Sequence, residues 1–169
     1  MFSWFKKKKE EAPKEQKQLQ LKPINYSAEV ILLWAKAVDG DKVIQLGLRE
    51  SGFPELFHAT NAIYLFQESR DWLMDNGYAH IMAMINAAEG LEKAQSWLYS
   101  NNMELLYHMG RAVDHEMDSW DWLGKNAPPD LFILTKSISQ NSLWLTARII
   151  TENFVSKIDF ALDTVIPYS

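Results

Sequence analysis

The sequence predicts an all-α fold, a tandem stack of short antiparallel helix pairs, and two observations lead to that prediction. The stretch from Ile31 to Lys136 repeats itself with a 25-residue period, and self-similarity at a fixed period is the sequence signature of a stacked repeat. Apolar residues within a repeat recur at three- and four-residue spacing, which is typical of buried helical stripes rather than of strands. One position of the repeat always holds a small residue: Ala37, Ala62, Ala87, Ala112 and Ser137.

The repeats divide the chain into units. Four full units span residues 31–55, 56–80, 81–105 and 106–130, and a partial unit follows at 131–140. We expect a first helix over roughly unit positions 1–9 and a second over roughly 11–19. Helices this short are marginal alone, so stacking must bury their apolar faces. A large residue in the second helix should fill the gap between layers, namely Trp72, Trp97 or Trp122.

The first unit carries the clearest boundary signals. Ser27 is a suitable N-cap for a helix that starts at Ala28, because its hydroxyl can accept from a free backbone N–H. Gly40 can adopt the left-handed conformation that ends this helix, and Asp41 can cap the next. Gly52 followed by Pro54 closes the unit.

Later units use weaker signals for the same breaks. The inner turn of unit two, residues 64–66, contains no glycine, so its break has the least support from sequence. Gly77 and Gly90 mark two further turns, and Asn102 can replace glycine because asparagine tolerates the left-handed conformation. The double proline at 128–129 predicts an extended connector, with Asp130 as the cap of the fifth first helix.

The last segment breaks the period. Residues 142–166 hold apolar residues at three- and four-residue spacing without glycine or proline, which predicts one long C-terminal helix. A terminal repeat with a polar outer face would cap the stack. The alternative is that this helix forms a homo-oligomer contact.

Residues 1–26 are expected to be a disordered basic tail, which leaves 27–169 as a single helical-repeat domain. The composition of 10–22, rich in Glu, Lys, Gln and Pro, favours disorder. An aromatic and basic cluster at the start could make weak contact with an anionic membrane; the alternative is a solvated leader. The cluster consists of Phe2, Trp4, Phe5, Lys6, Lys7, Lys8 and Lys9.

The charge distribution constrains the partners. Residues 1–27 hold seven Lys and three Glu, a charge of +4, whereas the whole chain carries −5, so the remainder carries −9. An acidic body argues against nucleic acid as its partner, since phosphate binding needs a positive face. The chain has no cysteine, which excludes disulfides and thiolate metal sites and is compatible with a cytoplasmic location. No apolar run is long enough for a membrane-spanning helix, and no secretory signal follows the lysines.

Candidate catalytic or metal-binding residues are few. His58 and His108 share a unit position two units apart, too far for one metal ion if each unit adds about 10 Å. The segment 114–118 gathers three acids and a histidine, but it aligns with inter-helix turns, where acids are expected for capping. No phosphate loop, nucleophile elbow or zinc motif is present. We therefore expect no cofactor and no enzymatic activity.

The inner turns carry the candidate partner-binding residues. They should fall along one edge of the stack and give an acidic ridge interleaved with Tyr64 and Phe66. A protein with a basic surface is the natural partner for such a ridge, although a merely solvated edge is the alternative. The candidates are Asp39, Asp41, Glu89, Glu92, Asp114, Glu116, Asp118 and Trp120.

As a class, the units resemble those of α-solenoid proteins, in which helix hairpins stack in register as in ankyrin or TPR repeats but without strands. The period is shorter than the roughly 33 or 34 residues usual in those two families, and their signature motifs are absent. The resemblance implies a non-enzymatic interaction scaffold or adaptor. From the absent cysteines and the N-terminal aromatic and lysine cluster, we expect it in the cytoplasm or at the inner face of a membrane. A second hypothesis is an inhibitor or antitoxin-like protein that binds a basic partner through the acidic edge.

Overall fold

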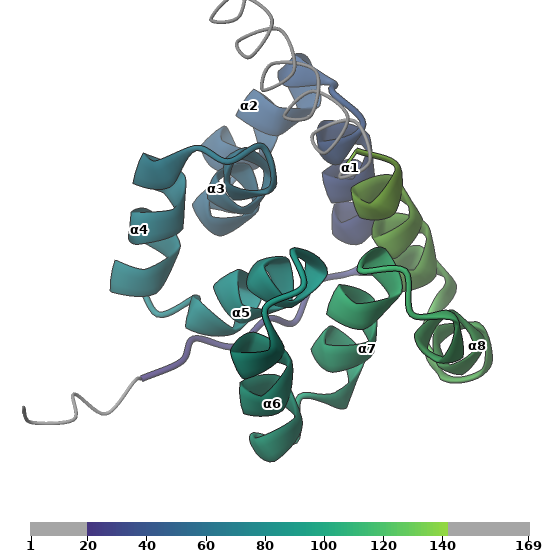
Figure 1. Ribbon diagram of the computed structural model, residues 1–169. Coiled ribbons are helices and arrows are strands. Elements are labelled where there is room, and N and C mark those ends of the chain that lie inside the picture. The colour runs from purple at the N-terminus through teal and green to yellow at the C-terminus, as the bar shows by residue number, and fades with distance from the viewer. Residues whose placement is uncertain (1–19, 142–169) are drawn as a thin grey trace, which may run out of the picture.

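The computed structural model describes residues 20–141, and within that range it contains helices and no strands. The all-α prediction is therefore confirmed, and the helices pack as consecutive pairs (Figure 1). The pairs are α1 (Ala28–Val38) with α2 (Lys42–Glu50), α3 (Pro54–Ile63) with α4 (Gln67–Asp75), α5 (Ala79–Ala88) with α6 (Glu92–Ser100), and α7 (Glu104–Val113) with α8 (Met117–Asn126). A ninth helix follows over 129–141, the last described residues.

The stack has an inner and an outer layer. The first helices contact one another in series, α1 with α3, α3 with α5 and α5 with α7, whereas each second helix packs mainly on the first helices beside it. The small residue of the repeat lies at this inner contact, and four of its five copies are fully buried. The leucine that follows each tryptophan is fully buried too, while the tryptophans are half-buried. Leucine and tryptophan therefore both pack between the layers: the leucine is fully enclosed, and the partly buried tryptophan packs against the core beside it.

The predicted 25-residue period is correct, but the predicted starting residues of the first helices are not. From α3 onward they begin at residues 54, 79, 104 and 129, two residues before the expected starts. Phe53, Tyr78 and Met103 occupy the N-cap positions without a side-chain cap bond, so the usual polar cap signal is missing there. Asp130 accordingly lies inside the first turn of the ninth helix instead of capping it.

The turns repeat as faithfully as the helices. Gly40, Leu65, Gly90 and His115 are separated by one period each, and all have positive φ, at 103°, 66°, 83° and 69°. The break without glycine in unit two is thus real, although the left-handed conformation costs a non-glycine residue about 1–2 kcal/mol. Asn102, with φ 57°, takes the place that Gly52 and Gly77 hold in earlier units.

Two predicted caps form as expected. The Ser27 hydroxyl accepts from the Val30 N–H at 3.5 Å, and Asp41 Oδ1 accepts from two backbone N–H groups of α2 at 3.0 Å each.

The stack curves until its last described helix reaches its first. Asp39, just after α1, accepts a hydrogen bond from Ser137 Oγ at 3.1 Å and another from Asn141 Nδ2 at 3.4 Å. The Tyr64 hydroxyl lies 2.6 Å from the Val38 carbonyl oxygen and 3.1 Å from Asn141 Oδ1. Figure 1 shows the ninth helix beside α1. The inner helices therefore surround a common centre.

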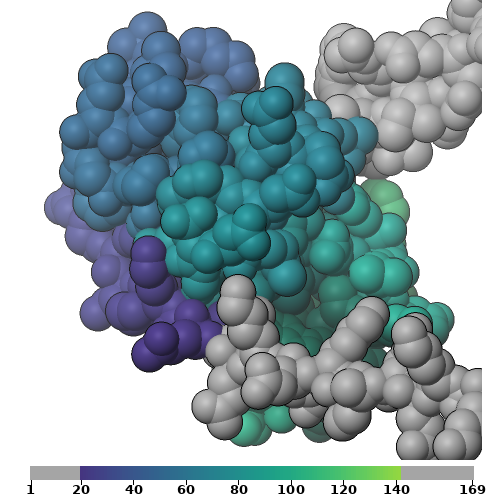
Figure 2. Space-filling model, turned by 90° about the vertical axis from the view of Figure 1, so that its left-hand side faces the viewer, coloured from purple at the N-terminus to yellow at the C-terminus, as the bar shows by residue number. Residues whose placement is uncertain are grey.

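Residues 20–27 form an extended segment that we call the N-terminal strap. The Lys22 N–H donates to the Gly77 carbonyl at 2.9 Å, and the Tyr26 hydroxyl donates to Glu55 at 2.8 Å. Figure 2 shows the strap, in purple, lying against the body. The sequence places most of this strap in the tail, yet it is fastened to two units of the stack. The candidate membrane residues at 2–9 and the long helix expected at 142–166 lie outside the described residues.

Candidate functional site

The inner turns and the first residues of the second helices lie along one side of the stack, which we call the turn edge (39–41, 64–66, 89–92 and 114–118). Two side-chain contacts each fasten a second helix to the inner turn of the next unit. Arg70 of α4 forms an ion pair with Glu89 in the next turn, and Gln95 Nε2 of α6 donates to Asp114 Oδ2 at 3.3 Å. The expectation that these turns share an edge therefore agrees with the contacts between units two, three and four.

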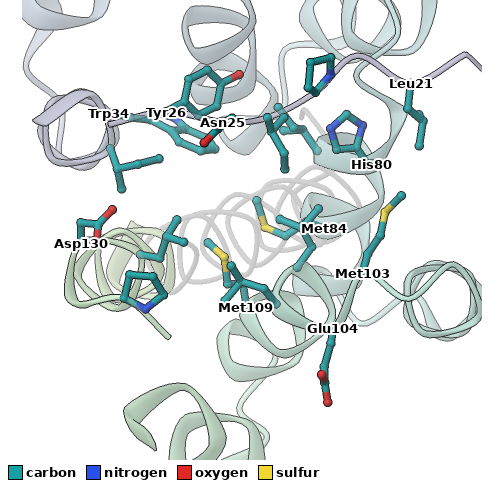
Figure 3. A pocket seen from close by; sticks show the side chains of 18 of the residues that line it. Leu21, Asn25, Tyr26, Trp34, His80, Met84, Met103, Glu104, Met109 and Asp130 are labelled. Carbon is teal, nitrogen blue, oxygen red and sulfur yellow. The ribbon is translucent and has the colours of Figure 1, made fainter. Parts of the chain in front are cut away.

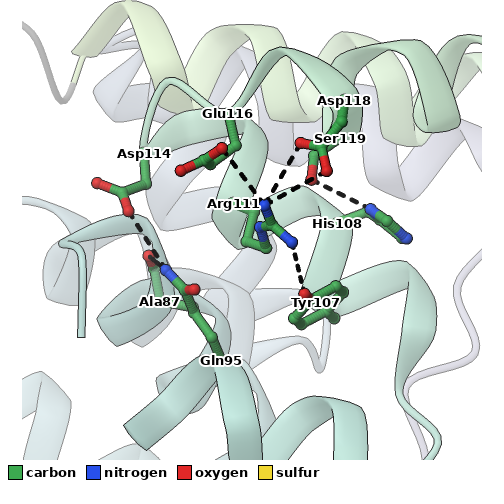
Figure 4. Close-up of polar contacts among 9 residues, drawn as sticks. All are labelled: Ala87, Gln95, Tyr107, His108, Arg111, Asp114, Glu116, Asp118 and Ser119. Carbon is green, nitrogen blue, oxygen red and sulfur yellow. Dashed lines mark hydrogen bonds and ion pairs between the residues drawn. The ribbon is translucent and has the colours of Figure 1, made fainter. Parts of the chain in front are cut away.

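Several of the predicted acidic residues are already engaged within the chain. Arg111 Nη2 lies 3.3 Å from a carboxylate oxygen of Glu116 and 3.4 Å from one of Asp118 (Figure 4). Asp41 is a helix cap, and Asp39 holds the ninth helix. Glu92 is exposed and has no ion pair within residues 20–141. The turn edge is thus less acidic in effect than the sequence suggests.

Trp120 does not project from the turn edge. Its ring is half-buried and packs edge-to-face on Phe132 of the ninth helix, with the ring centroids 5.6 Å apart. This tryptophan therefore belongs to the contact between α8 and the ninth helix.

Exposed apolar side chains accompany the acids on the turn edge. Phe66 is 60% exposed, Leu91 48% and Met117 70%. They occupy the same or adjacent positions in units two, three and four, so they recur along the edge. Phe66 was expected there, whereas Leu91 and Met117 were not singled out. Aligning the units would have placed Leu91 under Phe66, with Met117 one residue further along in the next unit.

His58 and His108 sit in matching surroundings in units two and four. His58 stacks on Trp72 and His108 on Trp122, both with ring centroids 4.2 Å apart. The Nδ1 atoms lie 3.1 Å from the hydroxyl oxygens of Ser69 and Ser119 respectively. Burial lowers the pKa of both histidines, and nearby Arg49 lowers that of His58 further.

These His–Ser pairs fit a packing role better than a nucleophilic one. Ser69 is 5% exposed and Ser119 is fully buried, so neither hydroxyl is open to a substrate. An activated serine needs its base within hydrogen-bond reach and a place for the reacting carbon beside it. The pairs instead join a first helix to a second helix within units two and four. The equal spacing of the two serines was the signal in the sequence that could have found them.

The acids and the histidine at 114–118 do not converge on a common point. Asp114 faces Gln95, while Glu116 and Asp118 face Arg111 (Figure 4), and His115 is exposed in the turn. Among the described residues, no group of three His, Asp or Glu side chains is placed to share a metal ion.

A pocket of about 890 Å³ lies at the centre that the inner helices surround (Figure 3). The strap forms one wall, and α1, α5, α7 and the start of the ninth helix form the others. Sequence reasoning missed it, because a repeat pattern gives no measure of how strongly the stack curves.

None of the helices in the described part has the length and apolarity needed to cross a membrane.

The chain matches no family model, no curated protein and no solved structure. The fold thus defines the chain as a stack of helical repeats.

Proposed function

We propose that the protein is a non-enzymatic interaction scaffold that binds a protein partner along the turn edge. The observation that carries this proposal is the row of exposed Phe66, Leu91 and Met117 among acidic side chains. Apolar side chains that gather on one part of a protein surface often mark a contact surface, whereas scattered single ones do not. Aromatic residues and methionine are enriched in protein interfaces.

The surrounding charge favours a basic partner. Glu92 is exposed on the edge, and the body outside residues 1–27 is acidic. Acidic groups around an apolar row accelerate encounter with a basic surface and favour it over an acidic one. The expected location is the cytoplasm.

Affinity capture with matched variants tests this proposal. One variant carries Phe66→Ser, Leu91→Ser and Met117→Ser; the control carries Met74→Ser and Tyr99→Ser, which are also exposed but lie toward the opposite ends of the second helices. We expect a stoichiometric partner that the wild type and the control retain, that the edge variant loses, and that added salt weakens. Equal capture by the edge variant and the wild type would contradict the proposal. If the captured partner is an enzyme and loses activity in the complex, the protein is an inhibitor of the kind considered above.

The aromatic and lysine cluster at residues 2–9 supports a second part of the proposal, weak attachment to an anionic membrane. Three aromatic rings beside four lysines combine an apolar and an electrostatic signal. Sedimentation with anionic vesicles should pellet the full chain at low salt and leave residues 20–169 in solution. If both chains stay in solution, the cluster does not attach the protein to membranes.

A further inference from the structure

The central pocket lies at the end of the stack opposite to the turn edge. The helices α1, α5, α7 and the ninth helix line it with residues of their first two turns. Ile31, Ile81 and Leu106 supply aliphatic walls. Its volume of about 890 Å³ falls within the roughly 300–1,000 Å³ of pockets that enclose a bound group.

Three methionines make the lining suitable for aromatic side chains. Met84, Met103 and Met109 all line the pocket, and Figure 3 shows them below the strap. Methionine is unbranched and adapts its shape to what it contacts, and its sulfur makes favourable contacts with aromatic rings.

The edges of the pocket are acidic. Glu104 and Asp130 line it, and neither forms an ion pair within residues 20–141. Figure 3 shows the Glu104 carboxylate directed outward at one edge and Asp130 at another. Of the described residues, Lys22 is the one lysine in the lining, and its ammonium nitrogen lies 5.2 Å from the centre of the Tyr78 ring. The pocket therefore suits an apolar group that carries positive charge at its outer end.

The N-terminal part of the chain joins the described structure beside this pocket, because Leu21 of the strap lines it. Eleven residues, 10–20, connect Leu21 to Lys9. Extended, they reach at most about 36 Å, whereas a helix of ten residues is only about 15 Å long. The aromatic and lysine cluster at residues 2–9 is therefore within reach of the pocket.

The C-terminal part of the chain leaves the described structure at the other end of the ninth helix. Asn141 contacts Asp39 and Tyr64 at the turn edge, whereas Leu131 at the start of that helix lines the pocket. Position and charge therefore both favour the N-terminal cluster as the occupant.

We propose that the aromatic and lysine cluster at residues 2–9 docks in the central pocket of its own chain. Its three aromatic rings lie among the methionines and the aliphatic walls, and its lysines face Glu104 and Asp130. Tethering raises the effective concentration of the cluster to roughly the millimolar range, so modest contacts are sufficient.

The docked cluster uses neither the turn edge nor a membrane. It adds a form of regulation, because the pocket and an anionic membrane compete for the same side chains. This competition, unlike the docking itself, rests on the membrane attachment proposed above.

Methionine methyl NMR of the full chain, without vesicles, tests the docking. The chain has no cysteine, so the variant Ser3→Cys carries a single nitroxide label. We expect the label to remove most of the signal intensity of Met84, Met103 and Met109 and to leave that of Met117, at the turn edge, unchanged. Full intensity at the three pocket methionines, or an equal loss at Met117, would overturn the proposal.

Two substitutions on the ninth helix locate the contact. Leu131→Trp fills the pocket from a half-buried position and should restore the signals of the pocket methionines. The control Ile133→Trp is exposed and does not line the pocket, so the loss should remain. If Leu131→Trp fails to fold, Leu106→Trp blocks the pocket from α7 instead. A loss that persists in the blocked variant would place the cluster elsewhere and overturn the proposal.

Neutralising the edges tests the role of charge. The double variant Glu104→Gln, Asp130→Asn should restore part of the pocket signals, and added salt should act in the same direction. The control Glu92→Gln removes an exposed acid at the turn edge and should change nothing. Equal loss in the double variant and the wild type would contradict the proposed lysine contacts.

Labelling the other terminus and diluting the sample distinguish the remaining occupants. A label at Ser156→Cys should leave the pocket methionines at full intensity; a loss there, with none from Ser3→Cys, would assign the pocket to the C-terminal part and overturn the proposal. The loss caused by the Ser3→Cys label should not change on dilution. If it disappears, the cluster docks in a second copy of the chain and not in its own.

Discussion

The two stacked histidines show how single residues tie the helices of one unit together. His58 and His108 each combine a tryptophan face with a serine hydroxyl, and both are half-buried. Burial lowers the pKa of each ring; at His108, Arg111 lowers it further while Glu104 and Asp118 raise it. His80, buried in the pocket wall, also has a lowered pKa because of burial.

These lowered pKa values predict a loss of stability in mild acid. Below the unfolded pKa of about 6.5 the unfolded chain binds protons on these rings before the folded chain does. The free energy of unfolding should therefore be fully present above about pH 6.5 and fall as the pH drops toward the folded pKa values. Urea denaturation at pH 7.5 and 5.5 measures the fall. The double variant His58→Phe, His108→Phe should show a smaller fall, and the exposed His115→Gln should match the wild type. An unchanged fall in the double variant would contradict this reasoning.

The turn residues show what sequence could and could not predict at this scale. Gly40 and Gly90 were recognisable because glycine adopts positive φ at little cost. Leu65 and His115 occupy the same positions with φ 66° and 69°, and only the repeat register places them there. Local propensity alone would not put a leucine in the left-handed conformation.

At the scale of elements, α5 and α7 approach each other closely at Gly110. A Cβ built on Gly110 would lie 2.6 Å from Ala87 Cβ and 3.0 Å from the Met84 carbonyl oxygen. The sequence marked Ala87 as a small position of the repeat, but Gly110 carries no such mark, since Thr60 and Thr135 occupy its place in other units. The absence of a side chain at Gly110 is what allows this approach.

Gly110→Ala should therefore destabilise the protein. In an exposed helix interior, glycine to alanine stabilises by up to about 1 kcal/mol, but here α5 and α7 must separate, and overpacking typically costs about 1–3 kcal/mol. Gly124→Ala is the matched control, because Gly124 lies in α8 and its added Cβ would meet nothing within 4 Å. Chemical denaturation should show opposite signs for the two variants. A stabilised Gly110→Ala would mean that the helices adjust without cost.

The elements themselves were largely predictable, and their exact starts were not. The repeat register located each first and second helix because apolar spacing and small residues recur in every unit. The first helices began two residues early because Phe53, Tyr78 and Met103 serve as N-caps without a polar bond. The polar cap signal is therefore absent at those starts, although α3 carries another marker, Pro54 in its first turn.

At the scale of the whole molecule, the curvature of the stack brings its first and last described units together. A linear solenoid contacts only its neighbours, yet here the first turn meets the ninth helix across 98 residues of sequence. This closure creates the central pocket, and it depends on small rotations added at every unit. The sequence pattern gives no measure of the total rotation between the first and last units. The turn edge could therefore be predicted from the sequence, while the pocket could not.

Because the stack closes on itself, we expect a substitution in the first unit to change the local stability of the last described helix. Asp39→Ala removes the bonds to Ser137 and Asn141 and should accelerate native-state hydrogen exchange of the amides at 134–138 severalfold, since each lost hydrogen bond contributes about 0.5–1.5 kcal/mol. Asp41→Ala, two residues away, removes the cap of α2 at a cost of about 1 kcal/mol, and within residues 20–141 the Asp41 side chain bonds only to α2. It should accelerate exchange in α2 and leave 134–138 unchanged. If Asp39→Ala also leaves that segment unchanged, the first and last units are energetically independent and the stack behaves as an open solenoid.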